Sequence, residues 1–305
     1  MTAMTTAERR GYHQICGANG AMMVIACDQR GGMRSLLAAT PEEQASIGND
    51  VLGDTKADIT RFLAAHAGCV LVDPICAVPK LVDNDLLPRD TALLIGIDAS
   101  GWDTSPEGYR ISKMVDGVNA RRVRELGGTG GKIMVYLRMD TPAANTKNLE
   151  TLKAYIEDFA REDLLLVVEF LTYRLEGESA EDYAAKIPLL IRQGSEACLA
   201  LGAKVLKIPY PGSDEACAEI TRIAGDVPWA VLSAGVDHET FLGQVEAAMK
   251  NGASGVIAGR SLWKDCISLD RAVSQKKLSS VAVSRLRDIQ AVISRYYRGQ
   301  NSKAA

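Results

Sequence analysis

The chain has 305 residues, 47% of them hydrophobic, and a formal net charge of only -3 at pH 7. This length supports one large core or two modest ones, while the near-neutral charge and few aromatic residues exclude a basic stacking surface for nucleic acid. The sequence contains no run of 18 apolar residues and residues 1–10 contain no apolar signal core, so we expect a cytoplasmic protein without a membrane span.

The cysteines and histidines argue against disulfides and metal sites. The seven cysteines are odd in number and show no paired C-x-x-C spacing, so we expect reduced and mostly buried thiols. Cys27 and Cys76 lie near predicted strand ends, where a reactive thiol is the alternative. His13, His66 and His238 are the only histidines and none ends a predicted strand. We therefore expect no metal and no other cofactor.

Short apolar runs alternate with longer amphipathic stretches, which is typical of repeated βα units around a parallel sheet. The predicted strands are 21–27, 69–72, 92–97, 133–137, 164–168, 205–208, 229–232 and 255–258. The predicted helices are 42–65, 112–126, 145–161, 179–201, 213–225 and 238–250, then a helix or loop around 262–273 and a closing helix at 278–297. The pattern predicts an α/β protein, a (β/α)8 TIM barrel formed by residues 1–305 as a single domain, with a short N-terminal segment at 1–20.

Ionisable residues stand at the carboxyl ends of five predicted strands. Asp28, Asp73, Asp98 and Glu169 each follow a strand, and Lys207 closes the apolar run that begins at residue 203. The carboxyl ends of barrel strands carry the loops of the open face, so this accumulation of charge predicts an active site there. For Asp73 and Asp98 taken singly, a helix cap or a salt bridge is the alternative.

Lys207 is the most informative of these residues. An ammonium group costs free energy in an apolar barrel, so such a lysine tends to lose its proton and become a nucleophile toward carbonyl carbon. The alternative is a strand-end lysine whose amine reaches water.

Small residues follow the last two predicted strands, as Ser233-Ala234-Gly235-Val236 and Ala258-Gly259-Arg260-Ser261. Small side chains let backbone N–H groups approach an anion closely, and Arg260 would add a bidentate clamp. These loops predict a phosphate site formed by Ser233, Gly235, Gly259 and Arg260. A pair of ordinary turns is the alternative.

Taken in order, these segments resemble the bacterial class I tagatose-1,6-bisphosphate aldolase family and its sulfofructose-phosphate aldolase relatives. The motifs are ACDQRG at 26–31, GWDT at 101–104, GKIMVY at 131–136, VEFLTY at 168–173, VLKIP at 205–209, LSAGV at 232–236 and AGRSLW at 258–263. They span nearly the whole predicted barrel.

The resemblance implies roles for four catalytic residues. Lys207 is the Schiff-base residue, Glu169 and Asp28 transfer protons in roles that could be exchanged, and Lys132 is a second active-site lysine that lowers the pKa of Lys207. Lys132 is predicted just before the fourth strand, so its side chain must run up inside the barrel to reach the rim. The alternative is a solvated strand-start lysine.

The resemblance also bears on the substrate. Arg30 is the first candidate for the distal anionic group, and a helix-start surface charge is its alternative. Arg138 is a further candidate for substrate binding because it stands where the tagatose enzymes tend to have an acidic residue. Arg138 and the short loop at 209–213 favour the sulfonate-handling relatives, whereas the motifs at 101–103 and 170–173 look more like the tagatose branch.

The expected activity is reversible cleavage of tagatose or fructose 1,6-bisphosphate, by a lyase, to dihydroxyacetone phosphate and a three-carbon aldehyde. One alternative is a 6-deoxy-6-sulfofructose-1-phosphate aldolase that releases sulfolactaldehyde. Another is a sugar-phosphate isomerase or a non-catalytic sugar-phosphate-binding barrel. The expected partner is a phosphorylated sugar, with no nucleic acid or membrane, and a homo-oligomer stays open.

Overall fold

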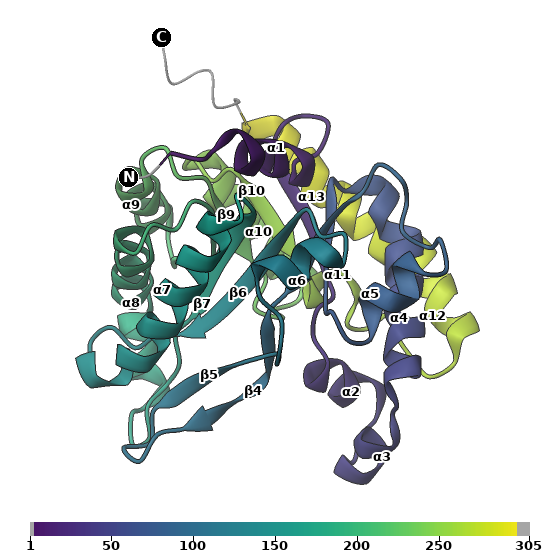
Figure 1. The fold of residues 1–305 in the computed structure, drawn as a ribbon, viewed down its shortest axis with the longest axis horizontal. Coiled ribbons are helices and arrows are strands. Elements are labelled where there is room, and N and C mark those ends of the chain that lie inside the picture. The colour runs from purple at the N-terminus through teal and green to yellow at the C-terminus, as the bar shows by residue number, and fades with distance from the viewer. Residues whose placement is uncertain (1–2, 298–305) are drawn as a thin grey trace.

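The computed structural model describes residues 3–297, and they form a closed barrel of eight parallel strands (Figure 1). The strands are β1 (Met22–Ala26), β2 (Cys69–Val72), β3 (Ala92–Gly96), β6 (Gly130–Tyr136), β7 (Leu165–Leu171), β8 (Leu206–Ile208), β9 (Trp229–Leu232) and β10 (Gly255–Ala258). Their order around the barrel is β1-β10-β9-β8-β7-β6-β3-β2. The predicted (β/α)8 barrel is therefore confirmed. The predicted domain also includes residues 1–2 and 298–305, which lie outside the described residues.

Helices follow the strands and cover the outside of the barrel (Figure 1). They are α1 (Thr6–Ile15), α2 (Gly31–Leu37), α3 (Pro41–Ser46), α4 (Asn49–Leu63), α5 (Ala77–Val82), α6 (Ala120–Glu125), α7 (Thr146–Arg161), α8 (Ala180–Ala200), α9 (Asp214–Ala224), α10 (His238–Lys250), α11 (Arg260–Trp263), α12 (Arg271–Lys277) and α13 (Val283–Tyr296). A π-helical turn, Leu278–Ala282, joins α12 to α13. Helix α13 buries Leu286, Ile289 and Ile293 and packs against α4 and α10, so the predicted closing helix is present in two pieces.

Several elements differ from the prediction. The helix predicted at 42–65 is divided into α3 and α4, and α2 was not predicted. Residues 112–114 belong to a strand rather than a helix, in an antiparallel hairpin of β4 (Asp98–Thr104) and β5 (Arg110–Met114). The apolar spacing of Ile111, Met114 and Val115 is typical of a helix. Gly117, with φ +71°, has a conformation outside the helical region, so α6 begins only after it. In Figure 1 the hairpin projects at the same end as α2 and α3.

Helix α1 was also missed, since residues 1–20 were predicted only as a short segment. Thr5 and Glu8 form a capping box at its start, a signal that the sequence does contain. Its buried Tyr12 and Ile15 join Met22 and Leu165 inside the barrel, so α1 covers the amino-terminal end of the strands. This leaves the opposite end as the open mouth.

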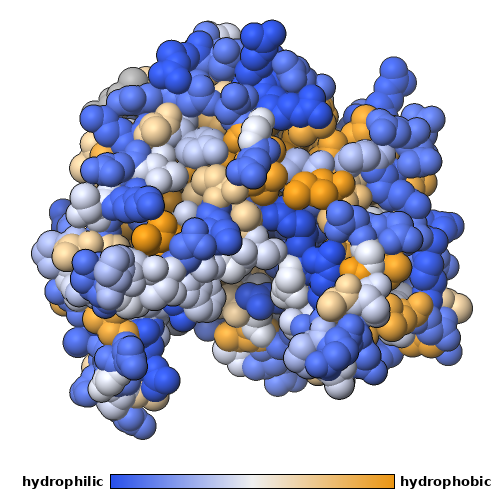
Figure 2. Space-filling model, turned by 60° about the horizontal axis from the view of Figure 1, so that its bottom comes forward, coloured by the Kyte–Doolittle hydropathy of each residue, from blue (hydrophilic) through white to orange (hydrophobic). Residues whose placement is uncertain are grey.

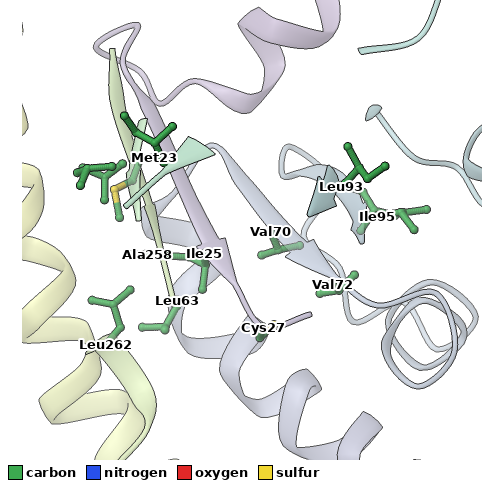
Figure 3. Packing of buried hydrophobic residues seen from close by; sticks show 14 of the residues in the cluster. Met23, Ile25, Cys27, Leu63, Val70, Val72, Leu93, Ile95, Ala258 and Leu262 are labelled. Carbon is green, nitrogen blue, oxygen red and sulfur yellow. The ribbon is translucent and has the colours of Figure 1, made fainter. Parts of the chain in front are cut away.

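Alternation along each strand decides which side chains point into the barrel. Strand side chains alternate between the two faces. Ile25, Ile95 and Val168 belong to the layer between strands and helices, part of which Figure 3 shows. Their neighbours in sequence form the interior cluster, which includes Val24, Leu94 and Val167. Continuing the interior alternation reaches Asp28, Asp98, Glu169 and Lys207 toward the carboxyl ends, and Lys132 within β6.

The seven cysteines are all free, and six of them are buried, as expected. Burial raises the pKa of the Cys27 thiol to about 12, so this thiol is protonated at neutral pH. Within residues 3–297, no helix combines the length and the apolar character that a membrane crossing requires.

Candidate active site

Lys207 and Glu169 form a buried pair at the mouth of the barrel. They face each other across the β7–β8 pair, in register, so both side chains project from the same level of the interior. The Lys207 Nζ donates a hydrogen bond to the Glu169 Oε2 at 2.8 Å, and the two residues are 5% and 6% exposed. The alternative of a lysine reaching out to bulk water is therefore wrong for Lys207.

Lys132 lies at the centre of the same cluster. Strand β6 begins at Gly130, three residues earlier than predicted, so Lys132 is an interior strand residue and not a solvated strand-start lysine. Its Nζ lies 2.7 Å from the Asp28 Oδ2, 2.5 Å from the Asp98 Oδ1 and 3.3 Å from the Glu169 Oε2. The two lysines thus share one oxygen of Glu169, and Lys132 draws three carboxylates together.

Asp98 belongs to this cluster although it was not among the predicted catalytic residues. Its position after the third strand was noticed, but a single strand-end aspartate has ordinary structural uses. The missing signal was alternation: Ile97 points outward, so Asp98 must point inward. Gly96 helps to make room, because a Cβ there would lie 3.2 Å from the Cβ of Asp28.

The surroundings of the cluster shift the pKa values of Asp28 and Asp98 in opposite directions. Burial would raise the pKa of Asp28, but the charges of Lys132 and Lys207 outweigh burial and hold this pKa well below its usual range. Burial, together with the charges of Asp28 and Glu169, raises the pKa of Asp98 despite its contact with Lys132. Burial opposes the charge on Lys132, yet its carboxylate neighbours raise its pKa far above the usual value. Asp98 is therefore the carboxylate of this pair that takes up a proton first.

Arg30 lies beside the cluster and is only partly paired. Its Nη2 donates to the main-chain oxygen of Asp98 at 3.2 Å, and its Nη1 lies 3.8 Å from the Asp73 Oδ1. Asp73 also pairs with the buried Lys56, and it accepts main-chain hydrogen bonds from two following residues. Asp73 therefore has a structural role as a salt-bridge partner and cap, which was the alternative interpretation of this residue. The Arg30 Nη1 is buried without a hydrogen-bond partner, so this group is free to donate a hydrogen bond to a ligand.

The two predicted phosphate loops lie next to each other at the mouth. Ala234 and Gly235 have φ values of +48° and +84°, so the chain turns sharply after β9. A Cβ on Gly235 would lie 3.2 Å from the Arg260 Cζ, which places the guanidinium against this turn. Within residues 3–297 no carboxylate lies at ion-pair distance from Arg260. A Cβ on Gly259 would lie 2.9 Å from the main-chain oxygen of Ala26, so only glycine fits there.

Arg138 is not available to a substrate, contrary to the prediction. An arginine has five N–H donors, and all five of these are used inside the protein. The guanidinium donates twice to Asp140, twice to Glu178 and once to the main-chain oxygen of Tyr173, over distances of 2.6 to 2.9 Å. The residue is 0% exposed. Arg138 holds loops together, and its charge is already neutralised.

The cluster lies at the end of the barrel where the β4–β5 hairpin projects, because Asp98 is the first residue of β4. Figure 2 turns this end forward and shows hydrophilic residues spread over it with hydrophobic residues among them. A buried lysine–carboxylate pair, a second charged lysine and an unpaired arginine beside glycine-rich turns thus converge on one mouth. Such an arrangement can bind an anionic carbonyl compound and move protons at its carbon chain.

Known proteins with similar sequences include two tagatose 1,6-diphosphate aldolases. Tagatose 1,6-diphosphate aldolase 2 of Streptococcus agalactiae serotype III (strain NEM316) is 23% identical over 95% of this chain and 96% of its own length. Tagatose 1,6-diphosphate aldolase of Staphylococcus aureus (strain bovine RF122 / ET3-1) is 25% identical, with 84% of each chain covered.

Solved structures share the fold. The fructose-bisphosphate aldolase from Slackia heliotrinireducens DSM 20476 superposes with a TM-score of 0.64 at 17% identity, covering 98% of this chain and 96% of its own. A Schiff-base-forming fructose-1,6-bisphosphate aldolase gives 0.60 at 19% identity, covering 90% and 98%. The family description "DeoC/LacD family aldolase" matches residues 22–265, which is most of the chain. The resemblance inferred from the motifs is therefore confirmed, and this chain belongs to the DeoC/LacD family of aldolases.

Proposed function

We propose that this aldolase is a class I enzyme that forms a Schiff base at Lys207 and reversibly cleaves a ketose 1,6-bisphosphate. The products are dihydroxyacetone phosphate and a three-carbon aldehyde phosphate. The observation that carries the proposal is the buried contact of 2.8 Å between the Lys207 Nζ and the Glu169 Oε2 at the barrel mouth. This contact gives the amine a direct acceptor for the proton that it must lose before it attacks a ketone.

The proposed reaction begins when the neutral Lys207 Nζ adds to the C2 carbonyl carbon. Glu169 passes the proton it has taken to the carbinolamine oxygen, and water leaves to give a protonated imine. A carboxylate removes the C4 hydroxyl proton, the C3–C4 bond breaks, and its electron pair moves into the imine to form an enamine. The aldehyde leaves, C3 of the enamine takes a proton, and water hydrolyses the imine. The protonated imine is the electron sink that makes cleavage feasible.

Asp28 and Lys132 complete this proposal. Asp28, held ionised by the two lysines, is the proposed base for the C4 hydroxyl. Lys132, held charged by three carboxylates, places a fixed positive charge beside the Glu169 oxygen that Lys207 also contacts. Asp98 shares Lys132 with Asp28 and is the proposed reservoir for a proton during the cycle.

The proposed C1 phosphate site consists of Ser233, Gly235, Gly259 and Arg260. The positive φ values at Ala234 and Gly235 turn the main chain so that N–H groups can converge on an anion. Arg260, packed against Gly235, supplies the charge.

Gly235→Ala is expected to raise the KM for the bisphosphate about tenfold or more, because it combines a strained φ with a contact of 3.2 Å to the Arg260 guanidinium. Steady-state kinetics of purified protein measure this effect. Gly243→Ala is the matched control: Gly243 lies in α10 with nothing within 4 Å of an added Cβ, so its KM should not change. Equal KM values for the two variants would show that the phosphate does not bind at this turn.

The pairing of Arg138 weakens the case for a sulfonated sugar, since Arg138 was the main residue favouring it. A panel of tagatose 1,6-bisphosphate, fructose 1,6-bisphosphate and 6-deoxy-6-sulfofructose 1-phosphate, assayed for dihydroxyacetone phosphate release, tests the proposal. We expect the bisphosphates to be cleaved with the higher kcat/KM, with weak discrimination between the two C4 epimers. Binding without cleavage of any of the three would support a non-catalytic barrel instead.

A further inference from the structure

Arg110, in the β4–β5 hairpin, lies among three aromatic rings that the proposed mechanism does not use. Its Cζ is 3.8 Å from the ring centroid of Trp102, 4.9 Å from that of Tyr173 and 5.2 Å from that of Tyr136. Trp102 and Arg110 are diagonal neighbours across the two strands, because Trp102 pairs with Ser112 and Arg110 with Thr104. We call these four residues the aromatic–arginine cluster.

The aromatic rings hold the guanidinium without neutralising it. Within the described part of the chain, no carboxylate lies at ion-pair distance from Arg110. The contrast with Arg138 is direct, since two carboxylates there occupy four of five donors. Stacking uses the planar face of a guanidinium and leaves the donors along its edge able to bind an oxyanion in a bidentate way.

The cluster is rigidly attached to the barrel. The Asn148 side chain of α7 donates to the main-chain oxygens of Arg110 and Tyr136, at 2.8 and 2.7 Å, and accepts from the main-chain N–H of Ser112 at 2.8 Å. The Arg110 N–H donates to the Tyr173 hydroxyl at 3.3 Å. The hairpin is therefore fixed before any ligand arrives, which reduces the entropy cost of binding.

The cluster lies outward from the proposed catalytic residues on the same wall of the barrel. Tyr136 follows Lys132 by four residues on the interior face of β6, and Met134, between them, pairs in register with Glu169. Tyr136 is thus one interior position, about 7 Å along the strand, beyond the level of Glu169. In a ketose bound through C2, the C6 group lies four carbon–carbon bonds from the reacting carbon.

We propose that Arg110, packed over Trp102 and bordered by Tyr136 and Tyr173, binds the distal oxyanion of the substrate, the C6 phosphate of a ketose 1,6-bisphosphate. The identity of this anion rests on the proposed function. Arg110 replaces Arg30 as the distal anion ligand. The Nη1 of Arg30 has no hydrogen-bond partner, but Asp73 at 3.8 Å offsets the charge of Arg30. No carboxylate of the described residues offsets the charge of Arg110 in this way.

The kinetic test compares two substrates that differ only in the distal group. Arg110→Met is expected to lower kcat/KM for fructose 1,6-bisphosphate by about 10- to 100-fold, mainly through KM, and to leave fructose 1-phosphate within about threefold of wild type. Arg110→Lys keeps the positive charge but loses the paired N–H donors of the guanidinium, so it should retain only part of the wild-type kcat/KM. Lys113→Met, which removes an exposed cation of the same hairpin, is the matched control and should change neither substrate. An equal loss for both substrates would mean that Arg110 only holds the hairpin.

A second measurement does not depend on catalysis. Trp102 is 44% exposed and stacked on Arg110, whereas Trp229 and Trp263 are buried, so its fluorescence should report an anion at this guanidinium. Titration with inorganic phosphate should give a saturable change in emission that both Arg110→Met and Trp102→Phe abolish. A change that survives Arg110→Met would place the phosphate elsewhere and overturn the inference. If the protein showed no aldolase activity but its fluorescence still saturated with phosphate in a way that depends on Arg110, the anion site would stand and the proposed function would be wrong.

Discussion

Lys207→Ala is expected to abolish cleavage, with kcat falling on the order of 10⁴- to 10⁶-fold, because the electron sink cannot form without the amine. The fold should persist, since the substitution shortens one side chain at the mouth and leaves the interior cluster below it intact. Coupled assays of triose release measure the activity, and far-ultraviolet circular dichroism checks the fold.

Lys207→Arg separates nucleophilic attack from charge. The guanidinium keeps a positive charge beside Glu169 but is not a nucleophile, so this variant should be as inactive as Lys207→Ala. Substantial cleavage by Lys207→Arg would indicate that only the charge matters and that no Schiff base forms.

Lys132→Met is expected to cost both stability and activity. Lys132 is 2% exposed and compensates Asp28, Asp98 and Glu169, so its removal leaves buried carboxylates without a partner. Loss of one member of a buried ion pair typically costs about 3–5 kcal/mol of unfolding free energy. Urea unfolding measures the stability, and kcat should fall about 10²-fold or more in protein that is still folded.

The stability loss should depend on pH in a defined direction. Burial raises the pKa of both Asp28 and Asp98, and Lys132 is the main group that opposes it. Without Lys132 we expect both folded pKa values to lie above the ordinary 3.8, so that their contribution is favourable below that value and is lost as pH rises. In the wild type, Lys132 and Lys207 hold the pKa of Asp28 down, and its contribution is present above 3.8. The deficit of the variant should therefore grow as pH rises above 3.8, and a deficit independent of pH would contradict this account.

Lys204→Met provides a matched control at the opposite end of the barrel. The Lys204 Nζ pairs with the buried Glu8 of α1 at 2.5 Å, three residues before Lys207 but at the amino-terminal end. This variant should lose stability and keep its kcat. A similar loss of kcat in both variants would mean that Lys132 acts only through the fold.

The positions of the strand ends explain why so much of the site could be predicted from the sequence. The loops after the carboxyl ends form the open face of a barrel, so Asp28, Glu169 and Lys207 could be assigned to the mouth once the strand ends were located. Lys132 was harder, because Gly130 and Gly131 concealed the true start of β6 and made the lysine look like a strand-start residue.

Other parts of the site depend on contacts between distant segments. Arg138 was a reasonable candidate by position, but two of its N–H donors bind Glu178, which lies forty residues further along the chain. The aromatic–arginine cluster joins Trp102 and Arg110 of the hairpin with Tyr136 and Tyr173 of the barrel, and the hairpin itself was predicted in part as a helix. Local sequence patterns carry no information about these long-range contacts, because the contacts form only when the barrel closes.

Reductive trapping tests the central claim most directly. Wild-type protein is incubated with dihydroxyacetone phosphate and sodium borohydride, and intact mass and peptide mapping then locate the adduct. The account predicts one reduced ligand per chain, on the peptide containing Lys207, and none on Lys207→Arg. An adduct on Lys132, or binding of the triose with no adduct at all, would contradict it.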